Sequence, residues 1–159
     1  MGKVLRFGGA PGHQDDADEN WMFDGLEGLA IVIEDLDPVA SEAGLNRTNL
    51  QLQIEERLSE MGIPLAPLIA VTNDHPVAVL CVAIDADRHS TGPVACSLRL
   101  QVCEAAALVR NPEMGGGVVT WQTNDSWVSS FEDVQRETMA ALHEGLASLG
   151  ESFHAGQHA

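Results

Sequence analysis

Residues 94–102 read VACSLRLQV and alternate between apolar and polar side chains. Successive side chains of a strand point to opposite faces of a sheet, so this stretch has one apolar face and one polar face. The apolar face carries Val94, Cys96, Leu98, Leu100 and Val102, and the other carries Ser97, Arg99 and Gln101. The pattern therefore predicts a strand with one side turned to a core.

The strand-rich middle of the chain extends outward from this stretch. A strand at 77–84 and the polar loop 85–92 precede it, and together they predict a long hairpin. A flat strand from 94 to 109 would be about 53 Å long, so we expect a bulge or bend near 103–105. Residues 110–117 are rich in glycine and proline and predict a turn. Further strands are predicted at 26–36, 65–71 and 118–128.

Two amphipathic helices complete the pattern. In the first, at 45–62, Asn46 is a typical N-cap, and Gly62 stands just past the end, where a left-handed residue is favoured. Its apolar stripe recurs at helical spacing: Leu50, Ile54, Leu58 and Met61. The second helix is predicted at 131–153 after a Ser-x-x-Glu capping box, and Gly145 within it suggests a close helix contact.

The element order β-α-β-β-β-β-α predicts an α+β two-layer sandwich, with a mixed or antiparallel sheet and two helices on one face. We divide the chain into a flexible acidic N-terminal arm at 1–25, a single domain at 26–153 and a frayed tail at 154–159. Several strands are apolar on both parities, which is more than two helices can cover. The N-terminal arm, a second subunit or a partner must shield the remaining apolar side chains.

The composition narrows the function classes. The 159 residues carry eight basic and 24 acidic side chains, a net charge of −16 that repels nucleic-acid phosphates and anionic lipids. No window is apolar enough for a transmembrane helix. The first residues lack the apolar region of a signal peptide, so the chain as written is expected in the cytoplasm. A leader removed before Met1 would instead make the protein periplasmic or exported.

Two sets of residues are candidate sites. In the 85–92 loop, Asp85, Asp87 and His89 are possible metal ligands at i, i+2 and i+4, although the loop lacks the register of an EF-hand. We also consider His75 as a further ligand. The bulky run Trp21, Met22 and Phe23 could anchor the arm on the domain or contact a partner, and Trp127 is a candidate contact residue at a strand end.

The three cysteines, Cys81, Cys96 and Cys103, show no metal-binding spacing. They are typical of small apolar core residues. If the protein is exported, one disulfide between Cys81 and either Cys96 or Cys103 is the alternative.

The string GL-N-x-x-x-L-x-x-x-I-E-x-x-L-x-x-M-G-I at 44–63, together with Val-Thr-Trp at 119–121, resembles a group of small uncharacterised bacterial α/β proteins, many of them exported. The element order also resembles the lipopolysaccharide-assembly lipoprotein LptE and the N-terminal domain of TolB. The resemblance covers about residues 26–153 and implies a non-enzymatic assembly role without catalytic residues.

The sequence thus predicts a non-catalytic interaction or assembly module that works through a sheet edge, an apolar sheet face or an oligomer surface. It predicts no cofactor, and a protein partner or self-association. A metal-dependent enzyme or small-molecule binder that uses Asp85, Asp87 and His89 is the alternative. A third hypothesis is an adaptor whose acidic arm binds a basic partner.

Overall fold

The computed structural model describes residues 23–71 and 76–157. Its elements, in chain order, are β1 (Gly28–Ile33), α1 (Pro38–Glu42), α2 (Arg47–Glu60), the 3-10 turn η2 (Leu68–Ala70), β2 (Val77–Arg88), β3 (Val94–Leu108), β4 (Asn111–Ser129), the 3-10 turn η3 (Phe131–Asp133) and α3 (Val134–Gln157). Trp21, Met22 and His75 lie outside the described residues.

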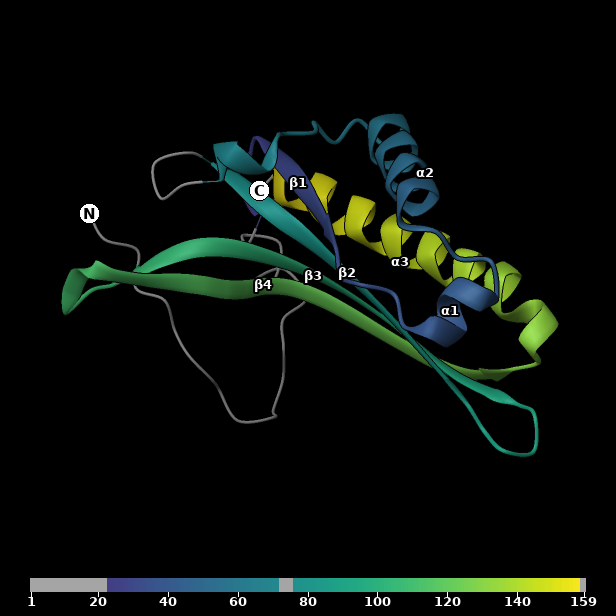
Figure 1. Cartoon of the computed structure of the whole chain (residues 1–159). Coiled ribbons are helices and arrows are strands. Elements are labelled where there is room, and N and C mark those ends of the chain that lie inside the picture. Colours follow the sequence, from purple (N-terminus) through teal and green to yellow (C-terminus); the bar gives the residue numbers. More distant parts are fainter. Residues whose placement is uncertain (1–22, 72–75, 158–159) are drawn as a thin grey trace, which may run out of the picture.

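The four strands form one mixed sheet in the order β1-β2-β3-β4. β1 runs parallel to β2, while β2, β3 and β4 form an antiparallel meander. All three α-helices lie on the same side of this sheet (Figure 1). The predicted α+β fold, a sheet with its helices on one face, is confirmed.

The first long helix, α2, begins and ends as its residues predict. The side chain of Asn46 accepts a hydrogen bond from the Asn49 amide at 3.1 Å, and Gly62 follows the helix at φ +72°. Leu50, Ile54 and Leu58 are buried against the sheet layer. Local capping and a spaced apolar stripe are therefore enough to define this helix.

Helix α3 packs closely against its neighbours at two of its glycines. A Cβ on Gly145 would lie 2.6 Å from Leu100 Cδ1 of β3, and one on Gly150 would lie 2.4 Å from Met61 Sδ beside α2. The predicted close contact at Gly145 is confirmed. The helix also runs on to Gln157, past the predicted end at 153, because the side-chain amide of Gln157 donates to the carbonyls of Phe23 and Leu26.

Three segments differ from the sequence predictions. Residues 65–71 form a single bridge, Leu65 to Leu29, and then the turn η2, because Pro64 and Pro67 cannot donate to a ladder. Residues 85–88, predicted as loop, continue β2, and residues 111–117, predicted as turn, are part of β4. The chain also forms the short helix α1, where Asp37 accepts a hydrogen bond from the Ala40 amide at 2.8 Å.

The two faces of the sheet differ in polarity. Toward the helices, β2 and β3 present fully buried side chains such as Leu80, Val82 and Leu100. On the open face, β3 and β4 are polar: Gln101 donates to Gln122 at 3.1 Å, and Arg99 pairs with Glu34 at 3.4 Å. Apolar side chains on this face come mainly from β1 and β2, which present half-buried Val32, Val79 and Cys81. Cys103 of β3 and the exposed Val119 and Val128 of β4 lie on the same face.

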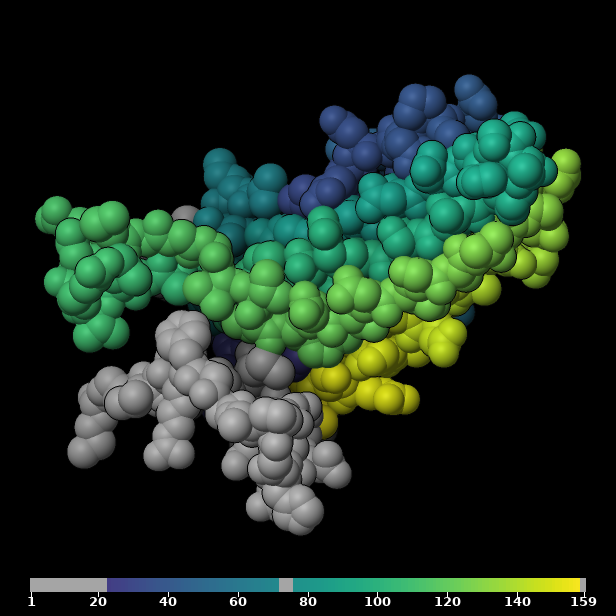
Figure 2. All heavy atoms as spheres, turned by 90° about the horizontal axis from the view of Figure 1, so that it is seen from below, coloured from purple at the N-terminus to yellow at the C-terminus, as the bar shows by residue number. Residues whose placement is uncertain are grey.

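Beyond the body of the sheet, β3 and β4 continue as a two-stranded ribbon. The last β3 residue that pairs with β2 is Cys103, opposite Val79, whereas residues 104–108 pair with β4 alone. From here on, the arm means this ribbon at 104–118, which is a different segment from the N-terminal arm at 1–25. Figures 1 and 2 show the arm projecting at one end of the molecule. A register shift between Val102 and Cys103 stands at its root, which confirms the predicted irregularity.

Candidate functional site

The arm and its surroundings hold most of the exposed large apolar side chains. Among the described residues nine large hydrophobic side chains are exposed, and six of them are on the arm, at its root or on η2: Leu68, Ile69, Leu108, Val109, Met114 and Val119. Val109 at the two-residue turn is 99% exposed. We call these six residues the apolar end.

A depression of about 320 Å³ lies at the root of the arm. Val79 and Cys103 line it from the open face of the sheet, and Val71 lines it from the segment that follows η2. Gly115, Gly116 and Gly117 form its wall on β4, and a Cβ on Gly116 or Gly117 would meet no atom within 4 Å. The glycines therefore leave an apolar hollow directly beside the projecting side chains of the arm.

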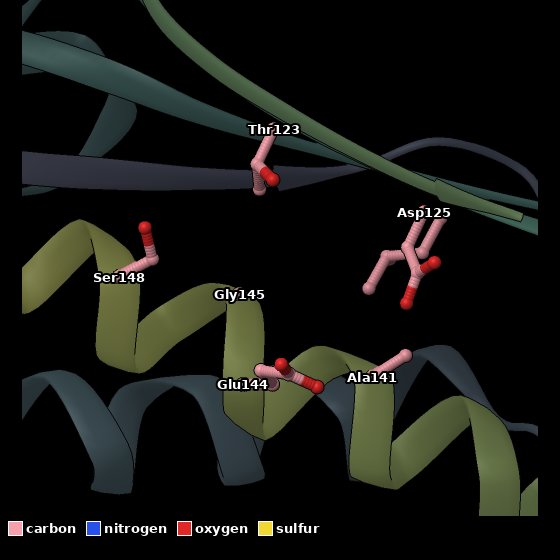
Figure 3. A pocket seen from close by; sticks show the side chains of 7 residues that line it. Thr123, Asp125, Ala141, Glu144, Gly145 and Ser148 are labelled. Carbon is pink, nitrogen blue, oxygen red and sulfur yellow. The ribbon is translucent and has the colours of Figure 1, made fainter.

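A second depression, of about 220 Å³, lies between the edge strand β4 and α3. Figure 3 shows Thr123 and Asp125 facing Glu144, Gly145 and Ser148 across it. Small side chains on α3 keep this crevice open. A neighbouring depression of about 280 Å³ continues it past Trp127, Glu137 and Glu144.

This crevice is acidic. Carboxylates face each other from both elements at Asp125, Glu137 and Glu144, while Glu137 also lies 3.6 Å from Arg136. An inward-facing charge on an edge strand is a common protection against unwanted strand pairing, and Asp125 fits that role. β4 is the outermost strand, so no strand of the described chain pairs with its other side.

The candidate metal ligands do not form a cluster. Asp85 and Asp87 lie on β2 rather than in a loop, and both are exposed. His89 is in the following turn, where its Nδ1 contacts the Thr91 hydroxyl at 2.7 Å. The described residues contain no group of three histidine, cysteine or acidic side chains arranged to hold a metal ion.

The candidate contact residues have different environments. Phe23 is 1% exposed and packs on Phe153 with ring centroids 5.8 Å apart, so it anchors the start of the domain and offers no surface to a partner. Trp127 is half-buried against the core, and its buried indole nitrogen has no hydrogen-bond partner among the described residues. One side of Trp127 lines the acidic crevice.

The cysteines divide between the two faces of the sheet. Cys96 is buried on the helix side, as expected of a core residue. Cys81 and Cys103 are half-buried on the open face, and their sulfur atoms are 4.0 Å apart. Burial, and then the neighbouring Cys103, raise the pKa of Cys81 to about 11.

Comparisons with known proteins add little to this description. No protein-family model matches the chain, and no curated protein matches it significantly. Among solved structures, a minor lipoprotein from Acinetobacter baumannii is similar over 79% of this chain and 87% of its own, at 14% identity and a TM-score of 0.29.

The helices of the described chain include none that is both long and apolar enough to span a membrane.

The feature that sequence reasoning missed is the arm. Its signal was present in the run 104–119, where a block of three alanines and a block of three glycines stand beside large apolar residues, but the glycine and proline content favoured a turn.

Proposed function

We propose that this protein is a non-catalytic assembly module that self-associates through the arm, with a second copy of the chain as the occupant of its apolar end. The observation that carries the proposal is the concentration of exposed apolar side chains on the arm and η2. Monomeric proteins rarely expose a contiguous apolar patch of more than a few hundred Å², and larger patches mark interaction sites. Docking would remove this surface from water.

The shape of this end favours a second copy. A two-fold interface requires one patch to carry both a projection and a matching hollow. Here Leu108, Val109 and Met114 project from the ribbon. The glycine-walled depression beside them is the hollow.

The charges of the arm are also self-complementary. Arg110 stands at the turn, while Glu104 and Glu113 lie on the two strands of the ribbon. Two arms packed in opposite directions would bring the arginine of one copy toward a carboxylate of the other. The net charge of −16 opposes close approach at long range, so added salt should strengthen the association.

A ribbon of two strands is marginally stable by itself, and a second ribbon would supply the missing packing. This role agrees with the non-enzymatic assembly modules that the sequence resembles, LptE and the TolB N-terminal domain among them. An envelope location, as in those proteins, is part of the proposal.

Sedimentation equilibrium over a wide dilution series tests the proposal. The wild-type chain should show a reversible monomer–dimer equilibrium. The double variant Val109→Asp, Met114→Asp should raise the dissociation constant at least about tenfold, because it would place a charge in each apolar contact. Raising the salt concentration should lower the dissociation constant of the wild type.

Leu52→Asp is the matched control for the single variant Met114→Asp, because each adds one negative charge. Leu52 is 60% exposed on α2 and Met114 is 56% exposed on the arm, so both substitutions remove a similar apolar surface. The control should dimerise as the wild type does. A wild-type chain that stays monomeric at every concentration, or an arm variant that dimerises unchanged, would overturn the proposal.

A further inference from the structure

We propose that Cys81 and Cys103 form a reversible disulfide that fastens the root of the arm to the body of the sheet. This inference does not rest on self-association. It concerns a covalent modification site on the open face of the sheet, whatever the arm contacts.

The register of the strands places the two thiols side by side. Cys81 of β2 is opposite Gln101, and Cys103 of β3 is opposite Val79, so the cysteines are diagonal neighbours on the same face. Their sulfur atoms are 4.0 Å apart. Side-chain rotation and a small strand adjustment are needed to reach the bonding distance of about 2.05 Å. Cys96 is buried on the opposite face and is excluded as a partner.

The backbone at this point is able to adjust. The ladder between β3 and β4 changes register between Val102 and Cys103, where Thr120 is an extra residue on β4. Such a bulge increases the local twist and interrupts the regular ladder. The bulge lies on the β4 side of Cys103, while the ladder between β2 and β3 that carries the two cysteines keeps its register.

The pair also stands where the arm begins. Val79 to Cys103 is the first pairing between β2 and β3, and every β3 residue beyond it pairs with β4 alone. In the reduced protein, backbone hydrogen bonds and packing hold this last position against β2. A link from Cys81 to Cys103 would hold the root of the arm covalently.

The surroundings of Cys81 slow its oxidation at neutral pH. Burial contributes most to raising the pKa of Cys81 to about 11, Cys103 and Glu34 raise it further, and Arg99 opposes them. At neutral pH this thiol is almost entirely protonated, and the protonated form is a poor nucleophile. Oxidation should therefore need a disulfide donor and should speed up as the pH rises.

The reaction is a thiol–disulfide exchange with a low-molecular-weight disulfide. The thiolate of one cysteine attacks a sulfur of the donor, which forms a mixed disulfide and releases one thiolate of the donor. The second cysteine, as its thiolate, attacks the protein sulfur of the mixed disulfide and releases the second donor thiolate. The protein loses two electrons and two protons, and the donor gains them as two thiols. An oxidising compartment favours the linked form, and a reducing cytosol favours the dithiol.

Peptide mapping after treatment with oxidised glutathione tests the inference. Trypsin cuts after Arg57, Arg88, Arg99 and Arg110, so Cys81, Cys96 and Cys103 fall in three separate peptides. We expect a single linked species that joins peptide 58–88 to peptide 100–110. The intact mass should fall by two hydrogens, and dithiothreitol should restore it. The full chain is treated at high dilution, so that no second copy covers Cys103.

Three single variants provide controls with defined outcomes. Cys96→Ser should form the link as the wild type does. Cys81→Ser and Cys103→Ser should each retain glutathione on the remaining open-face cysteine, because the second thiol that displaces it is missing. Stable glutathione adducts on wild-type Cys81 or Cys103 without a link, or a link that includes Cys96, would overturn the inference. These readouts are masses of the monomer, so they are independent of whether the arm dimerises.

Discussion

The ladder between β3 and β4 joins two regions that share a hydrogen-bonding pattern. They differ in their neighbouring elements and in the burial of their side chains. In the supported half, residues 94–103 pair with 119–129, β2 lies on the other side of β3, and α3 covers one face. In the arm, residues 104–108 pair with 111–118, and they have neither β2 beside them nor α3 over one face. Leu100 is fully buried in the first region, while Leu108 is 42% exposed in the second.

The difference separates what the ladder contributes from what packing contributes. Net backbone hydrogen bonds add little to stability once competition with water is counted, whereas burial of apolar side chains adds most of it. The supported half should therefore unfold with the whole domain. The arm should open locally at a much smaller free-energy cost, and its stability should depend on what docks against it.

The largest effect should come from the same substitution made in each region. Leu100→Ala leaves a cavity beneath α3 and should lower the free energy of unfolding by about 2–5 kcal/mol. Leu108→Ala removes an exposed side chain and should change it by less than about 0.5 kcal/mol. Urea denaturation followed by circular dichroism measures both. Similar losses for the two variants would mean that the arm unfolds together with the core.

A smaller effect is expected where α3 presses on the supported half. Gly145→Ala should cost about 1–2 kcal/mol, because the new Cβ would lie 2.6 Å from Leu100 Cδ1 in the buried core. Gly150→Ala meets the Sδ of half-exposed Met61, a flexible side chain that can move aside. There the better helix propensity of alanine should offset the contact and leave stability within about 1 kcal/mol. The same denaturation experiment compares them, and a Gly150→Ala variant less stable than Gly145→Ala would contradict the explanation.

Stiffening the arm should have a local effect alone. Gly116→Thr adds a side chain of high strand propensity at a position where nothing stands within 4 Å of the new Cβ. We expect the arm amides to gain about 0.5–1 kcal/mol of protection against hydrogen exchange while the global unfolding midpoint stays unchanged. A rise in the global midpoint would show that the arm belongs to the cooperative unit.

The smallest effect should come from the polar open face. Arg99 and Glu34 form a solvent-exposed ion pair at 3.4 Å. Arg99→Ala should therefore change the free energy of unfolding by about 0.2–1 kcal/mol, and high salt should reduce the difference from the wild type. A larger, salt-independent loss would point to packing by the arginine stem instead of charge.

The sequence predicted well those elements that local chemistry defines. Helix α2 is fixed by Asn46, Gly62 and an apolar stripe, all of which act within one helix. The strand at 94–102 alternates strictly, so its buried face was identified correctly. The close approach at Gly145 was also expected, because a glycine inside a helix costs stability that a contact must offset.

The errors arose where tertiary pairing overrides local preference. Gly115–Gly117 resemble a turn in isolation, and they extend as a strand because Ala105–Ala107 pair with them. Asp85 and Asp87 resemble loop residues, but on an open sheet face a charged side chain can occupy a strand at no desolvation cost. The short helix α1 was not predicted, although Asp37 and Pro38 begin it, because proline is favoured in the first helical turn.

The candidate site was predictable in part. The three cysteines and the excess of apolar residues were visible in the sequence, but the choice between Cys96 and Cys103 as the neighbour of Cys81 was left open. The 4.0 Å approach of Cys81 to Cys103 depends on the register between β2 and β3, which spans 22 residues of chain and leaves no local signal. The grouping of η2 with the arm depends in the same way on a contact between distant segments.

Native-state hydrogen exchange of the backbone amides, recorded at low and at high protein concentration, measures whether the arm opens separately from the domain and is stabilised by a second copy. In dilute protein we expect the amides of residues 104–118 to exchange far faster than those of the supported half. We also expect arm protection to rise with concentration while protection in the supported half does not change. An arm as protected as the supported half in the dilute monomer, or one whose exchange ignores concentration, would contradict these expectations.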